Sequence, residues 1–162
     1  MLKKKSVDQA LAVLRRQCAK MERSEFDVRR SMSRWAMTTQ EIQQVVDKLM
    51  AERFIDNARY AESFVRDKIQ FAGWGRRRII NQLRLKQIPQ SVIDSLNYMF
   101  EEECLDKLSE LLEKKSRLLR AKDRYDFKNK LVRFGLYRGF ELDDVLSVAT
   151  AITDRKYSGN ED

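Results

Sequence analysis

The chain has 162 residues, of which 43% are hydrophobic and 36% carry a charge, so it can form one domain or a short array of repeats around a buried core. Five glycines and one proline leave little material for hairpins and long loops, which favours an all-helical fold. The 33 basic and 25 acidic residues give a net charge of +8, which favours binding to polyanions or to acidic protein surfaces.

The residue types argue against catalysis. The chain has no histidine, which is the commonest general base and metal ligand, and no glycine-rich phosphate-binding loop. Cys18 and Cys104 belong to no reactive motif, so we expect buried, reduced thiols. Acidic clusters at residues 101–103 and 143–144 would suit a nuclease only if they converged on a metal. Both clusters lie in expected first helical turns, where the helix dipole favours acidic side chains, and this is the simpler explanation. We therefore expect a protein that is not an enzyme and has no cofactor and no metal.

The lysines at residues 3–5 are not followed by an apolar run, so no signal peptide is predicted. No stretch reaches the roughly 18 continuous apolar residues of a membrane span. We expect a soluble cytoplasmic monomer that does not bind membranes.

Helical periodicity begins near the N-terminus and continues to residue 152. The first apolar stripe contains Val7, Leu11, Leu14 and Cys18. Ser24 with Asp27 predicts the start of a second helix, and Thr38 with Glu41 is a capping box for a third. Further helices are expected at residues 58–71, 76–86, 89–100, 101–119, 125–134 and 141–152. Residues 158–162 are predicted to be a disordered polar tail.

A short pattern recurs three times along the chain. It is present as Trp35-Ala36-Met37, Lys86-Gln87-Ile88 and Arg138-Gly139-Phe140, at offsets of 51 and then 52 residues, and each copy leads into an apolar helix. This recurrence predicts three tandem three-helix repeats, at residues 1–56, 57–100 and 101–157. Units too small to close their own cores should stack, so we expect an elongated, curved array.

Two segments carry an excess of positive charge. No Asp or Glu lies between Lys68 and Ile93. The segment from Lys114 to Arg138 contains ten basic residues and only two acidic ones. A solvated helix surface is the ordinary explanation, but unpaired like charges at helical spacing favour a face that binds an anionic partner. The predicted contact residues are Arg76, Arg77, Arg78, Arg84, Lys86, Lys128, Lys130, Arg133 and Arg138. Burial is expected for Phe134 and Phe140, whereas base stacking stays open for Trp74 and Tyr137.

Residues 53–66 contain a further pattern, with a turn at Asp56-Asn57 and then a helix. Asp56 is suited to cap this helix, and Tyr60 with Phe64 is spaced for packing on one helical face. Arg59 is placed to pair with Glu62 or Glu52 on the surface. From the residues alone, this segment is interpreted as structural.

Three motifs belong together. They are the run from Phe54 to Val65, with Asp56, Arg59, Tyr60 and Phe64 followed by Arg66, then Gly75-x-x-Arg78-Ile79 with Leu83-x-x-Lys86-x-Ile88, and Leu136-x-Arg138-Gly139-Phe140. Together they resemble the RecX family of bacterial regulators of the RecA recombinase. The resemblance covers residues 7–152. The chain departs from the family pattern at Asn57, usually Asp, at Gln87, commonly Gly, and at Trp35-Ala36-Met37, often a Lys-Gly pair. The last two departures could change a helix corner.

The resemblance implies a non-enzymatic protein that lies in the helical groove of the RecA filament on DNA. It implies inhibition of filament growth, ATP hydrolysis and strand exchange in recombination and DNA repair, with weak binding to single- or double-stranded DNA. The alternatives are a direct DNA-binding protein that uses a helix-turn-helix, and a purely structural helical adaptor.

Overall fold

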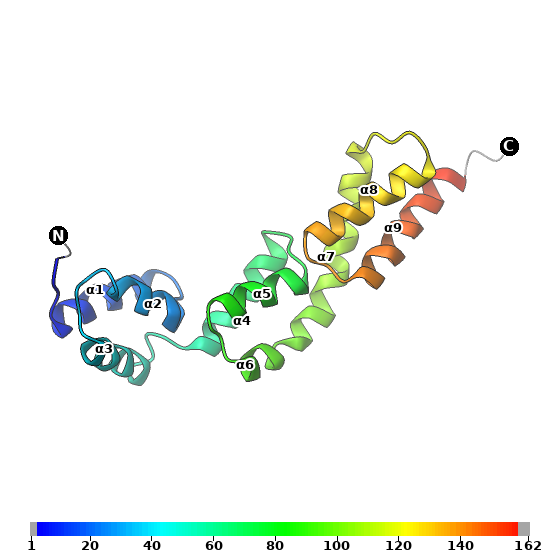
Figure 1. Cartoon of the computed structure of the whole chain (residues 1–162). Coiled ribbons are helices and arrows are strands. Elements are labelled where there is room, and N and C mark those ends of the chain that lie inside the picture. Colours follow the sequence, from blue (N-terminus) through cyan, green and yellow to red (C-terminus); the bar gives the residue numbers. More distant parts are fainter. Residues whose placement is uncertain (1–2, 159–162) are drawn as a thin grey trace. The chain divides into compact units, whose positions relative to one another are not determined.

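A computed structural model describes residues 3–158, and the regular structure within this range is entirely helical (Figure 1). The helices are α1 (Val7–Lys20), α2 (Glu25–Met32), α3 (Thr39–Ala51), α4 (Asn57–Gln70), α5 (Arg76–Leu85), α6 (Gln90–Ser95), α7 (Asn97–Leu118), α8 (Arg124–Tyr137) and α9 (Leu142–Tyr157). The predicted all-α class is therefore confirmed. None of these helices is both long enough and apolar enough to cross a lipid bilayer. Of the predicted polar tail, residues 159–162 lie outside the described range.

The chain divides into two compact units. One unit runs up to Phe64 and includes Leu83–Asp94, whereas the other consists of Val65–Gln82 and the residues from Ser95 onward. The division into three repeats at residues 1–56, 57–100 and 101–157 stays a prediction.

In the first unit, α1 and α2 both pack against α3, as Figure 1 shows. Their shared core is made of apolar side chains at helical spacing, namely Ala10, Leu11, Leu14, Val28, Met32, Val45, Val46, Leu49 and Ile55. Burial of an aliphatic side chain of this size contributes about 1.5–3 kcal/mol, so these residues hold the three helices together.

Side-chain caps fix where the helices of the first unit begin. The Ser24 hydroxyl accepts a hydrogen bond from the Asp27 backbone N–H at 3.2 Å, as predicted. Thr38 and Glu41 form the predicted capping box, with bonds of 3.2 and 2.8 Å. Such caps stabilise a helix by about 1 kcal/mol each, because they satisfy backbone donors that have no partner inside the helix.

In the second unit, α7, α8 and α9 pack against one another in pairs (Figure 1). Buried side chains on these helices include Leu108, Leu112, Phe127, Leu131 and Val145. Phe140 is also buried, as expected, whereas Phe134, for which burial was expected as well, is only half-buried.

Three predicted helix boundaries are wrong. The helices expected to end at residues 134 and 152 continue to Tyr137 and Tyr157. The third error is a break between two helices. We expected one helix to end at residue 100 and the next to begin at residue 101, but α6 ends at Ser95 and α7 begins at Asn97. Leu96 has no side-chain capping bond, and no glycine or proline marks the break. The apolar pattern simply continues through the break, so the sequence carries no local signal for it.

The middle residue of each recurring tripeptide adopts a left-handed backbone. The φ angles are +49° at Ala36, +55° at Gln87 and +92° at Gly139. After α5 the amides of Gln87 and Ile88 donate to backbone carbonyls of the last turn, and after α8 Gly139 and Phe140 do the same. The corner therefore forms with Ala36 and Gln87 in place of glycine, at the cost of a strained backbone.

Candidate polyanion-binding surface

Two of the predicted contact arginines are used inside the second unit. Arg76 donates a hydrogen bond of 3.0 Å to the side-chain oxygen of Asn97, and its guanidinium lies 5.8 Å from the centre of the Phe100 ring. Arg138 donates a hydrogen bond of 2.9 Å to the carbonyl of Ala72. These two guanidinium groups therefore stabilise the fold, and their charges are less available to a partner than the sequence suggested.

Two predicted contact lysines have acidic partners, contrary to the expectation of unpaired charge. Lys86 forms an ion pair with Asp27, which lies 59 residues earlier in the chain and in the same unit. Burial opposes ionisation of Asp27, but hydrogen bonds from Lys86 and Ser24 outweigh it, so the pKa of Asp27 is lowered. Lys130 pairs with Asp126 at 2.8 Å, one helical turn away. The sequence did not predict the pair of Lys86 with Asp27, because the fold brings together two segments that are far apart along the chain.

The backbone around Gly75 leaves no room for a side chain at the start of α5. Its N–H donates to the carbonyl of Arg138 at 2.8 Å, and the N–H of Arg77 donates to the carbonyl of Gly139 at 3.0 Å. A Cβ atom on Gly75 would lie 2.3 Å from the backbone nitrogen of Phe140, which no real contact allows. We call these two hydrogen bonds and this close approach the Gly75 contact. It joins two of the motifs that the sequence singled out, and it requires a residue without a side chain.

Other predicted contact residues remain at the surface. Arg77 and Arg133 are exposed, and Lys128 is partly exposed; within the part of the chain that the structure describes, none of these three side chains has a hydrogen bond or ion pair. Arg84 is exposed as well, and its Nε donates to the side chain of Gln90 at 3.3 Å. The positive charges of these four residues are therefore accessible and not neutralised by an acidic partner, as binding to an anionic partner requires.

The Gly75 contact brings the basic residues at the start of α5 close to those at the end of α8, within the second unit. Next to it lies a hollow of about 410 Å³ lined by Arg77, Arg78, Asn81, Gln82, Leu136, Tyr137 and Gly139. The Arg78 guanidinium lies 4.1 Å from the centre of the Trp74 ring and 5.9 Å from that of Tyr137. No carboxylate lines this hollow, so its electrostatic character is positive.

The residues of the 53–66 segment mainly support the fold. Asp56 accepts the backbone N–H of Arg59 at 3.0 Å, so it caps α4 as predicted. Arg59 pairs with Glu22 at 2.6 Å, a partner that we did not consider, whereas Glu52 pairs with Arg15. The guanidinium and Glu22 lie 37 residues apart in sequence, a distance at which no local pattern predicts a partner.

The remaining motif residues of this segment have similar roles. Tyr60 is buried and stacks on Phe64 with ring centres 5.8 Å apart, and burial raises the pKa of Tyr60 to about 12. Arg66 lies on the exposed side of α4. The side-chain oxygen of Asn57 accepts the N–H of Glu25 at the start of α2, at 3.1 Å. An aspartate could accept the same bond, so the departure from the family pattern at Asn57 preserves this contact.

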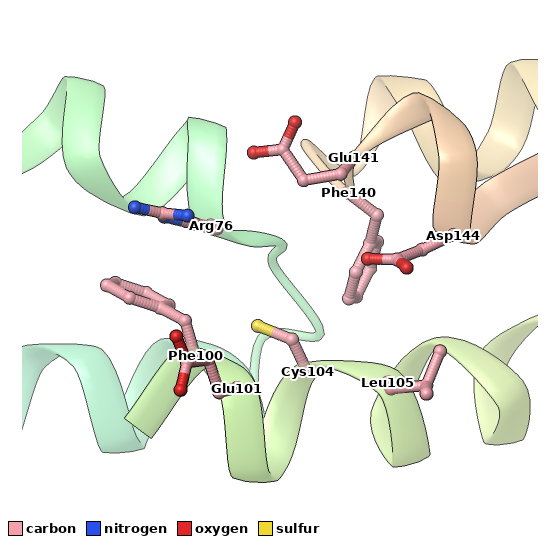
Figure 2. Close-up of a pocket in the computed structure, with 8 residues that line it drawn as sticks. All are labelled: Arg76, Phe100, Glu101, Cys104, Leu105, Phe140, Glu141 and Asp144. Atoms are coloured by element: carbon pink, nitrogen blue, oxygen red, sulfur yellow. The ribbon is translucent and has the colours of Figure 1, made fainter. Parts of the chain in front are cut away.

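A second pocket in the same unit, of about 260 Å³, is shown in Figure 2. Glu101 and Asp144 line it, so the two acidic clusters that we considered for a nuclease do approach one another. Within the described residues, however, no group of three or more potential ligands could hold a metal ion. The thiol of Cys104 points into this pocket, and burial raises its pKa to about 11, so it is protonated at neutral pH and a poor nucleophile.

Comparison with known proteins gives a consistent result. Residues 56–95 match the sequence model of the second three-helix domain of RecX, and residues 101–148 match that of the third. The Regulatory protein RecX of Finegoldia magna is 32% identical over 124 residues, which are 75% of this chain and 60% of that protein. The protein of the same name from Vibrio campbellii is 30% identical over 105 residues, which are 65% of this chain and 66% of that one.

A solved structure has the same fold. The crystal structure of RecX from Lactobacillus salivarius superposes with a TM-score of 0.80 at 20% identity, covering 90% of this chain and 96% of that one. The matched sequence segments span about two thirds or less of the two sequence relatives. The two domain models, the named relatives and the fold agree. The chain therefore belongs to the RecX family of regulatory proteins.

Proposed function

We propose that the chain regulates the RecA recombinase by binding its filament on DNA, and that it inhibits filament growth, ATP hydrolysis and strand exchange. The proposal places the protein in the bacterial cytoplasm, where that filament forms. Membership of the RecX family supports it. The observation that carries it is the positive surface of the second unit, where exposed Arg77 and half-buried Arg78 line a hollow that no carboxylate lines.

We assign this contact to those predicted basic residues that remain accessible. In the second unit, Arg77 and Arg133 are exposed and Lys128 is partly exposed, and none of them has an acidic partner among the described residues. Arg84 is exposed in the first unit, where its side chain donates to Gln90. Arg78 contributes its charge to the same hollow from a fixed position over Trp74. Exposed charges of this kind speed association with an anionic partner and lose their effect as salt concentration rises.

Reversal of two of these charges tests the proposal. Arg77→Glu with Arg133→Glu should reduce inhibition of DNA-dependent ATP hydrolysis by purified RecA about tenfold, because attraction is replaced by repulsion at the contact. The matched control is Arg30→Glu with Arg34→Glu, which changes the net charge equally at exposed positions of the first unit. The control should inhibit like the unmodified chain. Full inhibition by a folded Arg77→Glu, Arg133→Glu variant would refute the assignment.

A further inference from the structure

Tyr137 is an exposed aromatic residue of the second unit that lines the hollow described above. It lies at the C-terminal end of α8, and its side chain is 78% exposed. Arg133 precedes it by four residues, so the two side chains lie on the same side of the helix. Burial in a core, which accounts for Phe127 and Phe140, does not account for this ring.

Arg78 is held beside this ring. Its guanidinium lies 4.1 Å from the centre of Trp74, whose ring Lys68 also approaches at 4.8 Å. A cation over an aromatic ring is attracted by the ring's negative face, and a guanidinium fixed in this way loses less conformational entropy on binding a ligand. Arg78 thus presents a positioned charge near Tyr137, at 5.9 Å from its ring centre.

The rest of the hollow offers neutral polar groups. Asn81 and Gln82 extend from the next turn of α5, and each amide has both a donor and an acceptor. Arg77 adds an exposed charge on the same helix. A positive groove beside an exposed ring is the combination by which proteins bind single-stranded nucleic acid, because phosphates meet the charges while an unstacked base covers the ring.

We propose that this hollow binds single-stranded nucleic acid, with a base stacked on Tyr137 and the adjacent phosphates on Arg77, Arg78 and Arg133. A duplex keeps its bases stacked inside and would leave the ring uncovered. An acidic peptide would bind the arginines, but its binding would not depend on the Tyr137 ring. The inference rests on the proposed function and deepens it, because it assigns a direct DNA contact to this chain within the filament complex.

Binding of a fluorescent single-stranded oligonucleotide, followed by anisotropy, tests this. Tyr137→Ala should weaken binding about tenfold, whereas Tyr137→Phe should bind normally because the ring remains. Tyr125→Ala is the matched control, since Tyr125 is 76% exposed on the same helix and lies outside the hollow. An abasic oligonucleotide of equal length and charge should bind the unmodified chain and Tyr137→Ala with equal affinity.

Each other outcome overturns the inference. Equal binding of the base-containing oligonucleotide by Tyr137→Ala and the unmodified chain would show that no base stacks there. Competition by poly-glutamate as strong as by the oligonucleotide would identify an acidic protein site instead. The inhibition assay with RecA separates the two proposals. Inhibition without base-dependent binding refutes only the stacking site, whereas base-dependent binding without inhibition refutes only the proposed function.

Discussion

Replacement of Gly75 by alanine tests the Gly75 contact, which joins the start of α5 to the loop after α8. The added Cβ would lie 2.3 Å from the nitrogen of Phe140 and 2.4 Å from the carbonyl carbon of Gly139. Both are backbone atoms, so no side-chain rotation can relieve the overlap. The loop must move away, and the hydrogen bonds of 2.8 and 3.0 Å that Gly75 and Arg77 donate to it must lengthen or break.

The magnitude follows from these two effects. Overpacking in a well-packed site costs about 1–3 kcal/mol. A backbone hydrogen bond contributes about 0.5–1.5 kcal/mol, and two are at risk. We therefore expect Gly75→Ala to lower the free energy of unfolding by about 3 kcal/mol, which corresponds to a decrease in Tm of roughly 6–12 °C for a chain of this size.

Tryptophan fluorescence provides a local assay. Trp35 belongs to the first unit and Trp74 to the second, so a Trp35→Phe background reports unfolding of the second unit alone. Urea titrations of this background with and without Gly75→Ala give the change in free energy. Asn81→Ala, at an exposed position of the same helix, should change it by less than about 0.5 kcal/mol. If Gly75→Ala changes it as little as Asn81→Ala does, the close approach is not a feature of the folded protein.

Two further predictions concern the first unit. Asp27→Asn should lower the free energy of unfolding by about 2 kcal/mol at pH 7, because it removes the ion pair with Lys86. Since the pKa of Asp27 is lowered in the folded state, its contribution is present above about pH 4 and lost as the pH falls below that value. A difference between Asp27→Asn and the unmodified chain that stays constant in urea titrations from pH 7 to pH 3 would contradict this. Gln87→Gly should stabilise the chain by about 0.5–1 kcal/mol in thermal unfolding, because it relieves a φ of +55°. Gln44→Gly, in the interior of α3, should instead destabilise it by about 1 kcal/mol, and equal signs for the two substitutions would exclude relief of strain.

The left-handed corners show how a departure from the family pattern can be retained. Ala36 and Gln87 stand where the resemblance to the RecX family led us to expect glycine, and the sequence alone raised the question whether the corner changes there. The backbone keeps the left-handed conformation at both positions. The strain of a single such residue is small compared with the burial of the helices on either side, so tertiary packing decides the conformation.

The acid-poor segments of the sequence identify candidate basic residues without distinguishing what each one does. Arg76 and Arg138 form hydrogen bonds within the second unit, and Lys86 forms an ion pair with an aspartate. Arg77 and Arg133, by contrast, stay exposed. Along the sequence all five are equivalent positive charges in acid-poor segments. Only the neighbours that the fold brings to each side chain separate a structural role from a binding role.

By itself, the sequence determined the helical class, most helix boundaries, the caps at Ser24 and Thr38, and the family. These properties depend on residues within one or two helical turns, and the 3.6-residue period and capping patterns record them directly. The tertiary structure alone decided that Lys86 meets Asp27, that Gly75 meets the loop after α8, and that Tyr137 stands exposed beside Arg78. These contacts join segments tens of residues apart, and their geometry depends on how whole helices pack, which no local pattern encodes.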